Sequence, residues 1–306
     1  MSANINGRTY TAGKFLFEMD GTRVGFIQSC EGGHATAELA THNMGPNNYQ
    51  KKNVTTIKYA PVKIRTGAGM SKGFWEWMRA ALDLGVLYKN GAVTVADFNY
   101  KAQRRMDCMN MLMSKVTFPT WDGGSKETAY IDFEFSCEMI RWMKESGADV
   151  RGQVGPKQKT WHCSNFRYEM AGLPCKRVAK IEGLTWECKT AMDMIGDARE
   201  NTIHPVATTI TDFTLHISMA DLDPWAAKAD QWFRLGQCTE GDEMSSTITM
   251  LAPDMSTVVG TVELFNVGFK EFQAQPKLEA QTENVARFQV KCYAERSVFH
   301  PGNTDA

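Results

Sequence analysis

The stretch Phe15-Leu-Phe-Glu-Met-Asp-Gly21 occurs a second time as Phe166-Arg-Tyr-Glu-Met-Ala-Gly172, at an offset of 151 residues from position 15 to position 166. Both copies keep the first Phe, an aromatic residue two positions later, the Glu-Met pair and the final Gly. Apolar side chains at every second position are typical of a strand with one buried face, and Asp-Gly is typical of a tight turn. The stretch therefore predicts the start of a β-rich unit that is present twice.

Further pairs of residues support this interpretation. At the same offset, Glu31-Gly32 returns as Glu182-Gly183, Val62 and Ile64 as Phe213 and Leu215, and Phe74 and Leu82 as Trp225 and Phe233. Beyond this segment the offset becomes 155, pairing Val93 with Ile248, Phe133 with Phe288, and Cys137 with Cys292. An offset that is constant, changes once by four residues and is then constant again predicts duplication of a folded unit, with one insertion of four residues. Two unrelated domains that share a motif by chance are the alternative.

Length and composition set the domain organisation. The 306 residues fit two ordinary domains, for which we expect 1–150 as the first, 151–160 as a linker and 161–306 as the second. The formal net charge is −1 and no basic block occurs, which argues against a grip on nucleic acid phosphates. The eight cysteines form no C-x-x-C pair, and we expect free thiols in a protein made in a reducing cytoplasm. No long apolar run occurs, so we expect no membrane insertion.

Each half is predicted to contain several antiparallel strands and one helix. The polar stretch 34–53 contains Gly45-Pro46 and is expected to form a long hairpin arm rather than a helix. Ser71 and Asp223 are candidate N-caps of the two helices. The helical stripes that we expect to face the core are Phe74, Trp77, Met78, Ala81 and Leu82 in the first half and Trp225, Ala229, Trp232 and Phe233 in the second. A last strand is expected over 131–139, and mobile tails over 1–13 and 300–306.

The sequence offers weak candidates for chemistry. Gly67-Ala-Gly69-Met-Ser-Lys-Gly73 resembles a dinucleotide loop, but its third glycine is one position late and the predicted sheet is antiparallel. His162, Cys163 and Cys175 lack a fourth ligand at a suitable spacing. We therefore predict no enzyme, catalytic residue, cofactor or metal, and a nucleotide-dependent oxidoreductase using the 67–73 loop is the unfavoured alternative. Carboxylates such as Glu18, Glu134 and Glu138 are expected in solvated or intersubunit positions.

The order of motifs resembles the tail tube protein family of contractile-tailed bacteriophages. The resemblance rests on F-x-F-E-x-x-G at Phe15, the following E-G, a long polar hairpin, Y-x-P-V-x-I-R over Tyr59–Arg65, and F-W-E-W at Phe74. Each half looks like one copy of that family's unit. The resemblance implies a mainly β fold, a β-barrel or sandwich plus one α-helix per domain, that assembles side by side into rings around a channel.

The resemblance also implies a function. A ring of usually six domains suggests three chains of two domains each, a pseudo-sixfold homotrimer, or six chains with one domain outside. Expected partners are other copies of the chain, sheath, baseplate or terminator proteins, and DNA or an effector that passes without sequence-specific binding. The expected location is a virion tail or an extracellular or cytoplasmic injection particle. A ring that starts or ends the tube, or a secreted tube protein of the type VI kind, is the alternative.

Candidate positions follow from this resemblance. The arms 34–53 and 188–206 are expected to contact neighbouring domains or the next ring, through His42, Asn43, Met44, Asn47, Asn48, Met192, Asp193, Asp197 and Arg199. Lys58, Lys63 and Arg65 are candidates for positions facing the channel or the outer surface, and ordinary solvated strand faces are an equal alternative.

Overall fold

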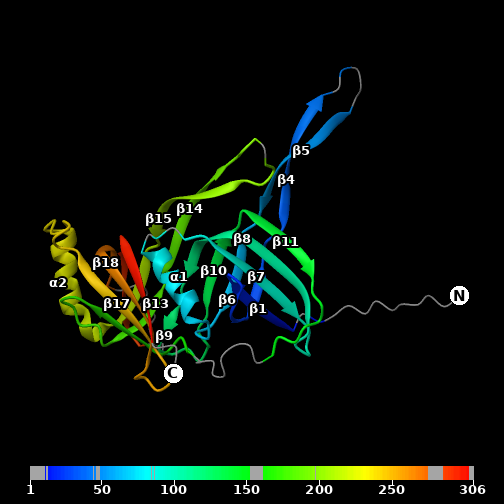
Figure 1. Ribbon diagram of the computed structural model, residues 1–306. Helices are drawn as coiled ribbons and strands as arrows, with labels where there is room; N and C mark the ends of the chain where they lie inside the picture. Colours follow the sequence, from blue (N-terminus) through cyan, green and yellow to red (C-terminus); the bar gives the residue numbers. More distant parts are fainter. Residues whose placement is uncertain are drawn as a thin grey trace.

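The chain is mainly β and its sheets are nearly closed, like a barrel (Figure 1). The computed structural model describes residues 11, 13–43, 45, 49–83, 85, 87–151, 161–196, 198–274 and 285–302. We call the described residues up to 151 the N-terminal half and those from 161 the C-terminal half. The expected linker thus lies almost wholly outside the described residues.

The N-terminal half comprises β1 (Lys14–Met19), β2 (Thr22–Ile27), β3 (Ser29–Glu31), β4 (Ala35–Asn43), β5 (Gln50–Tyr59), β6 (Val62–Thr66), α1 (Lys72–Leu82), β7 (Lys89–Ala96), β8 (Ala102–Thr117), β9 (Trp121–Asp122), β10 (Ile131–Ser136) and β11 (Met139–Lys144). The C-terminal half comprises β12 (Phe166–Met170), β13 (Val178–Glu182), β14 (Thr185–Asp193), β15 (Thr202–Ile210), β16 (Phe213–Ser218), the short 3-10 helix η1 (Met219–Asp221), α2 (Leu222–Phe233), β17 (Met244–Leu251), β18 (Val258–Gln273), β19 (Arg287–Tyr293) and β20 (Arg296–Pro301).

The two halves have the same order of antiparallel strands. The first sheet contains the path β1-β7-β8-β10-β6-β3 and the second contains β12-β17-β18-β19-β16-β13. The strands β11 and β20 pair with β8 and β18 in corresponding places. Each half also has a long hairpin, β4–β5 or β14–β15, and one α-helix after the hairpin. The predicted mainly β fold, with antiparallel strands and one α-helix in each half, is therefore confirmed.

Strand register refines the predicted correspondence. Phe17 lies opposite Val93, and Tyr168 lies opposite Ile248, as the offsets of 151 and 155 require. In the closing strands, however, Phe135 lies opposite Val62 and Cys292 lies opposite Phe213, so Cys292 corresponds to Phe135 and not to Cys137. The expected pairing of the closing strands is wrong by two residues. Because strand side chains alternate with a period of two, the same face is buried in either register.

The repeated glycines occupy backbone conformations that other residues rarely adopt. Gly21 and Gly172, which end the two copies of the opening stretch, have φ values of +76° and +79°. The Glu-Gly pairs behave alike, since Gly32 has φ +88° and Gly183 has φ +91°. A Cβ atom on Gly32 would lie 1.9 Å from the carbonyl oxygen of Pro61. These turns require glycine, which explains why it recurs at these positions.

An aromatic core lies between each helix and its sheet. The ring of Phe74 on α1 is 6.0 Å from Phe17 and 4.9 Å from Phe133, measured between centroids. In the other half, Trp225 on α2 stacks on Phe269 at 5.8 Å. Offset and edge-to-face contacts of this kind stabilise cores beyond the area they bury. The predicted helical stripes are confirmed, except for Phe233.

Four local expectations are wrong. Phe233, expected in the core, is 49% exposed at the end of α2, whereas the corresponding Leu82 on α1 is 1% exposed. The N-cap of α2 is Asp221 rather than Asp223, because the 3-10 turn η1 leads directly into the helix. His300, expected in a tail, lies in β20, and β11 continues the chain after the predicted last strand.

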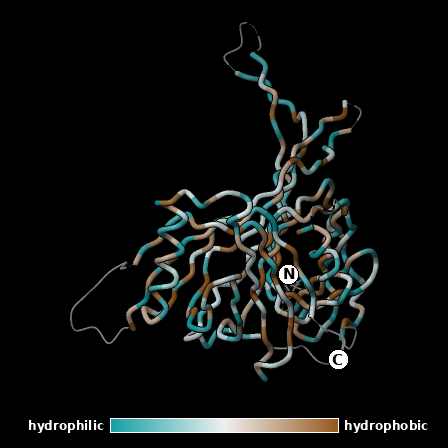
Figure 2. The backbone as a smooth tube through the Cα atoms, turned by 90° about the vertical axis from the view of Figure 1, so that its left-hand side faces the viewer, coloured by the Kyte–Doolittle hydropathy of each residue, from teal (hydrophilic) through white to brown (hydrophobic). Residues whose placement is uncertain are grey.

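The hairpin arms rise from the same end of the molecule (Figures 1 and 2). The arm β4–β5 is a separate two-stranded sheet that projects beyond the body, and its strand β4 is exposed at nearly every residue. The arm β14–β15 instead belongs to the sheet of the N-terminal half, because β14 pairs with β8. The same kind of hairpin is thus a separate sheet in one half and, in the other, is seated on the sheet of the body.

The first testable prediction concerns the placement of α2 on its sheet. Trp232 is 5% exposed, and its ring lies 6.1 Å from that of Phe269. We expect Trp232→Ala to lower the free energy of unfolding by about 3–5 kcal/mol, measured by chemical denaturation. Leu235 is 69% exposed, and Leu235→Ala should change the free energy of unfolding by less than about 0.5 kcal/mol. Equal effects of the two substitutions would contradict the described packing.

Candidate functional site

The most distinctive site is a junction at which the C-terminal half completes the sheet of the N-terminal half. Three pairs of residues join β14 to the end of β8: Thr185 with Thr117, Trp186 with Val116, and Glu187 with Lys115. Trp186 is 3% exposed and Val116 is fully buried. The side chains of Lys115 and Glu187 form an ion pair across the two strands. Backbone pairing satisfies N–H and C=O groups of β8 that would otherwise face outward at a sheet edge.

Side chains of the N-terminal half hold the seated arm in place. The Glu138 carboxylate accepts a hydrogen bond from the backbone N–H of Ile203 on β15 at 2.9 Å. Its other oxygen accepts a bond from the Asn110 side-chain amide at 2.6 Å. The hydroxyl of Tyr88 donates to the carbonyl of Ile203 at 2.6 Å. Ile203 is only 4% exposed, so both of its backbone groups depend on these partners.

The base of the arm β4–β5 also contacts the tip of the arm β14–β15. The backbone N–H of Ile57 donates to the carbonyl of Arg199 at 3.2 Å. The Arg141 guanidinium donates to the Tyr59 hydroxyl at 2.6 Å and pairs with Glu200. That guanidinium lowers the pKa of the Glu200 carboxyl, which favours its charged form. These contacts link β5, β11 and the tip of the seated arm.

A helix–strand contact forms the apolar part of the junction. Trp75 on α1 packs against Phe299 on β20 with their ring centroids 5.7 Å apart. The two side chains are 4% and 3% exposed, respectively. At the edge of this contact, the Arg296 guanidinium donates to the Asp83 carboxylate. The helix α1 is therefore covered on two sides, by its own sheet and by the other half.

A charged row crosses the polar face of the joined sheet. Glu31, Lys63, Glu134, Lys115 and Glu187 lie opposite one another on β3, β6, β10, β8 and β14. Lys63 pairs with Glu134 at 3.3 Å, and in the next row Arg65 pairs with Asp132 at 2.6 Å. The charges alternate in sign, so the row is close to neutral over its length. Their strand neighbours Val62 and Ile64 point to the opposite, buried face.

The three basic residues predicted to face the channel or the outer surface each form an ion pair with a carboxylate. Lys63 and Arg65 lie on this polar face, and each is paired with a carboxylate of β10. Lys58 lies at the base of the projecting arm and pairs with Glu38 of the same hairpin. The structure does not bring Lys58 into one cluster with the other two.

The predicted arm residues are exposed where the structure describes them. His42 and Asn43 lie at the end of β4, and Met192 and Asp193 at the end of β14. Of the predicted residues, Arg199 takes part in the contact between the arms, through its carbonyl oxygen. Met44, Asn47, Asn48 and Asp197 lie outside the described residues. The sequence did not indicate that Glu138 accepts the backbone N–H of Ile203, a contact that we call the clasp. It also did not indicate the Trp75–Phe299 contact.

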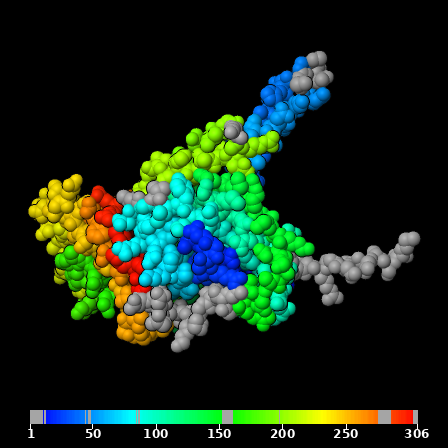
Figure 3. Space-filling view, in the orientation of Figure 1, coloured from blue at the N-terminus to red at the C-terminus, as the bar shows by residue number. Residues whose placement is uncertain are grey.

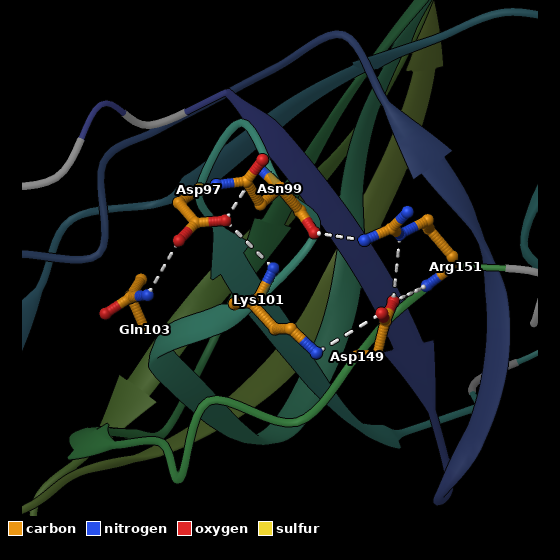
Figure 4. A network of polar contacts seen from close by, with 6 residues as sticks. All are labelled: Asp97, Asn99, Lys101, Gln103, Asp149 and Arg151. Carbon is orange, nitrogen blue, oxygen red and sulfur yellow. Dashed lines mark hydrogen bonds and ion pairs between the residues drawn. The ribbon is translucent and has the colours of Figure 1, made fainter.

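A second polar network lies at the turn between β7 and β8 (Figure 4). The Asp97 carboxylate accepts hydrogen bonds from the backbone N–H groups of Asn99 and Lys101 and from the Gln103 side chain. Lys101 also pairs with Asp149 at 3.3 Å, and Arg151 donates to the carbonyl of Asn99 at 3.0 Å. The network fixes the last described segment of the N-terminal half against its own sheet.

The candidates for chemistry have structural explanations. The stretch 67–73 connects β6 to α1 within an antiparallel sheet, so it lacks the parallel unit of a dinucleotide site. Burial raises the pKa of the Cys163 thiol, and that of Cys175 to about 11, which disfavours the thiolate that would bind a metal. Within the described residues no cluster of His, Cys, Asp and Glu could hold a metal ion. In the same part of the chain, no helix has the length and apolar character needed to span a membrane.

The fold and the junction define a mainly β protein whose two halves are joined by strand pairing. Residues 11–141 match the family model of the T4-like virus tail tube protein gp19. The expected resemblance to tail tube proteins is thereby confirmed, and this part of the chain carries a structural unit of the tail tube type. A search of curated proteins gave no significant match.

Several solved structures align with about half of the chain. A chain from the sheath/tube terminator of an extracellular contractile injection system, PVC, is 14% identical, with 45% of this chain and 99% of that chain covered and a TM-score of 0.39. A chain from the tube-terminating cap of the anti-feeding prophage is 14% identical, with 47% and 100% covered and a TM-score of 0.40. Hcp1 from Flavobacterium johnsoniae is 14% identical, with 44% and 97% covered and a TM-score of 0.31.

The second testable prediction concerns the clasp on the seated arm. Glu138→Ala removes the acceptor of the Ile203 amide, which should lower the free energy of opening this arm by about 1–3 kcal/mol. Hydrogen exchange of β15 should therefore become faster. Glu295 makes the same contact with Asn266, at 2.8 Å, as Glu138 makes with Asn110. Glu295→Ala is the matched control and should leave exchange of β15 unchanged in the monomer; equal protection in both variants would refute the clasp.

Proposed function

We propose that the chain is a tandem duplication of the tail tube unit and that three chains form one ring of six units around a channel. The units are residues 1–150 and 161–306, joined by the linker 151–160. The shared strand order of the halves supports the duplication. The protein acts as a structural subunit of a phage tail tube or of a related contractile injection system, and not as an enzyme.

The pairing of β14 with β8 is the observation that carries this proposal. It joins one unit to the next by a heterologous contact, in which the two partners use different surfaces. A repeated heterologous contact closes into a ring when its rotation divides a full turn evenly, and otherwise gives an open helical filament. The covalently linked halves then supply every second contact of the ring, and chain-to-chain contacts supply the others.

We further propose that the charged row on the polar sheet face lines the channel. Its alternating charges present few unpaired basic groups, as the ion pairs of Lys63, Arg65 and Lys115 illustrate. Nucleic acid phosphates bind strongly to unpaired cations and release counterions on binding. A nearly neutral wall therefore lets DNA or a protein effector slide past without being held.

The exposed tip of β4–β5 is the proposed contact to the next ring, and the sheath, baseplate and terminator proteins are the proposed outer partners. The assembled particle is then a virion tail or an injection apparatus. A ring that starts or ends the tube is the second candidate. The pairing of β14 with β8 favours it, because the base of one arm is then occupied within the chain and only β4–β5 forms a separate two-stranded sheet.

The third prediction tests the ring. Native mass spectrometry of the purified chain at increasing concentration should show a species of three times the chain mass of 34.3 kDa. Negative-stain microscopy should show discs or hollow filaments with a central channel. A hexamer of chains would replace the trimer in the proposal, and a monomer at all concentrations would overturn it. Single discs without filaments would favour the ring that starts or ends the tube.

The fourth prediction tests the arm. Replacing residues 41–50 by a short Gly-Ser loop removes the end of β4–β5, which the rest of the fold does not contact in the described structure. We expect the melting temperature to be unchanged and discs to form, but stacking into filaments to stop. Filaments of normal length would show that the arm has no role in stacking.

A further inference from the structure

We propose that one chain joins the next by repeating its own internal junction, with Trp142 of β11 docking on α2 of a second copy. This inference rests on the proposed ring and names the surfaces that close it. The internal junction has an acceptor side, made of α1, the end of β8 and Glu138, and a donor side, made of the arm β14–β15 and β20. Each side has a counterpart elsewhere in the chain, and these counterparts are the proposed interface.

The strand that would be donated is exposed. Ala35 lies opposite Tyr59 in one arm as Trp186 lies opposite Ile210 in the other, so residues 34–36 correspond to 185–187. In β14 these residues are buried or half-buried against β8, whereas 34–36 are all exposed. In the described part of the chain, β4 pairs with β5 alone. The first residues of β4 are therefore a donor segment without its acceptor.

The matching acceptor edge lies at the end of β18. Asn110 and Asn266 both have positive φ, +48° and +52°, and occupy the same place in β8 and β18. Residues 271–273 then correspond to 115–117, the acceptor of β14. Within the described residues, 271–273 pair with β19 on one side only. A strand edge of this kind presents N–H and C=O groups with which another strand can pair.

The ion pair of the internal junction is not repeated at the counterpart position. In the internal junction the acceptor contributes Lys115 and the donor Glu187. The counterpart of Lys115 is Glu271, and the donor segment brings the uncharged Thr36 in place of Glu187. The new contact therefore places no like charges directly across the paired strands at this position.

The clasp is also present twice. Glu295 accepts a hydrogen bond from the Asn266 amide at 2.8 Å, as Glu138 does from Asn110 at 2.6 Å. In the internal junction, the other oxygen of Glu138 accepts the N–H of Ile203. Arm register makes Lys52 the counterpart of Ile203, because Thr41 lies opposite Lys52 as Met192 lies opposite Ile203. Glu295 is thus placed to accept a hydrogen bond from the backbone N–H of Lys52 in a second copy.

The apolar contact has open counterparts at both sides. Trp142 on β11 corresponds to Phe299 on β20, since Met139 lies opposite Met109 as Arg296 lies opposite Phe265. Trp142 is 54% exposed, whereas Phe299 is 3% exposed against α1. On α2, Ala226 occupies the position of Trp75 on α1. In the proposed contact, the larger Trp142 replaces Phe299 on the strand and the smaller Ala226 replaces Trp75 on the helix. The exposed Phe233 of α2 lies at the edge of the same surface.

The position of these surfaces suits a head-to-tail contact. Figure 1 shows α2 at one end of the body and β11 at the other, with the internal junction between them. The space-filling view places α2 and the segment around β11 at the two extremes of this face (Figure 3). Surfaces at opposite ends cannot meet within one chain, so each needs a second copy.

The fifth prediction is a cross-linking experiment on the full-length chain. Cys238, an exposed thiol, is first replaced by Ser. Met139→Cys with Arg234→Cys then places thiols at the counterparts of Arg296 and Asp83, which form an ion pair in the internal junction. A short bismaleimide should yield covalent dimers and trimers. The pair Asp83→Cys with Arg296→Cys is the matched control and should yield a cross-link within one chain.

Two single substitutions complete the test. Trp142→Glu should abolish the trimer seen by native mass spectrometry while leaving the melting temperature unchanged, since the side chain is exposed in the monomer. Met255→Glu, at another exposed apolar residue in the β17–β18 turn, should leave the trimer intact.

If rings form but neither cross-link nor Trp142 dependence is observed, the named interface is wrong and the ring proposal survives. If no ring forms in the unmodified chain, the proposed function itself fails and this interface with it.

Discussion

The pairing of β14 with β8 is the interaction on which the rest of this structure depends. Strand edges present rows of unpaired N–H and C=O groups, and a small β module that leaves them open exposes a site for association. Here the second half fills the edge of the first with its hairpin arm. The Glu138 clasp and the Trp75–Phe299 contact add side-chain specificity to a backbone pairing that has little of its own.

The asymmetry between the two halves follows from this pairing. The helix α1 is buried on two sides and carries Trp75 and Trp77 in the buried state, whereas α2 buries one stripe and leaves Phe233 exposed. The sequence differences between the helices thus agree with their different neighbours. Likewise, one hairpin lies against a sheet and the other projects into solvent. The two halves thus share a strand order but lie in two different environments.

Local sequence signals predicted much of the fold. The alternation in the opening stretch, the Asp-Gly turn and the aromatic stripes each act over a few residues, and the structure confirms them except at Phe233. The junction was harder to predict because it depends on which edge a distant strand meets. Nothing near Glu138 or Ile203 in the sequence indicates that they bond. The repeated Asn110–Glu138 and Asn266–Glu295 pairs were a usable signal, but their offsets of 156 and 157 differ from the one that governs the start of the repeat.

The covalent link between the halves has a kinetic consequence. Half of the contacts in a three-chain ring would form within single molecules, at an effective concentration that does not fall on dilution. A ring of three chains then needs two bimolecular encounters and one closing contact, whereas a ring of six single units needs five encounters and one closing contact. Such a chain would nucleate rings at lower abundance than a single-unit protein with equally strong contacts. Early in synthesis, when few subunits are present, this difference would decide whether assembly starts at all.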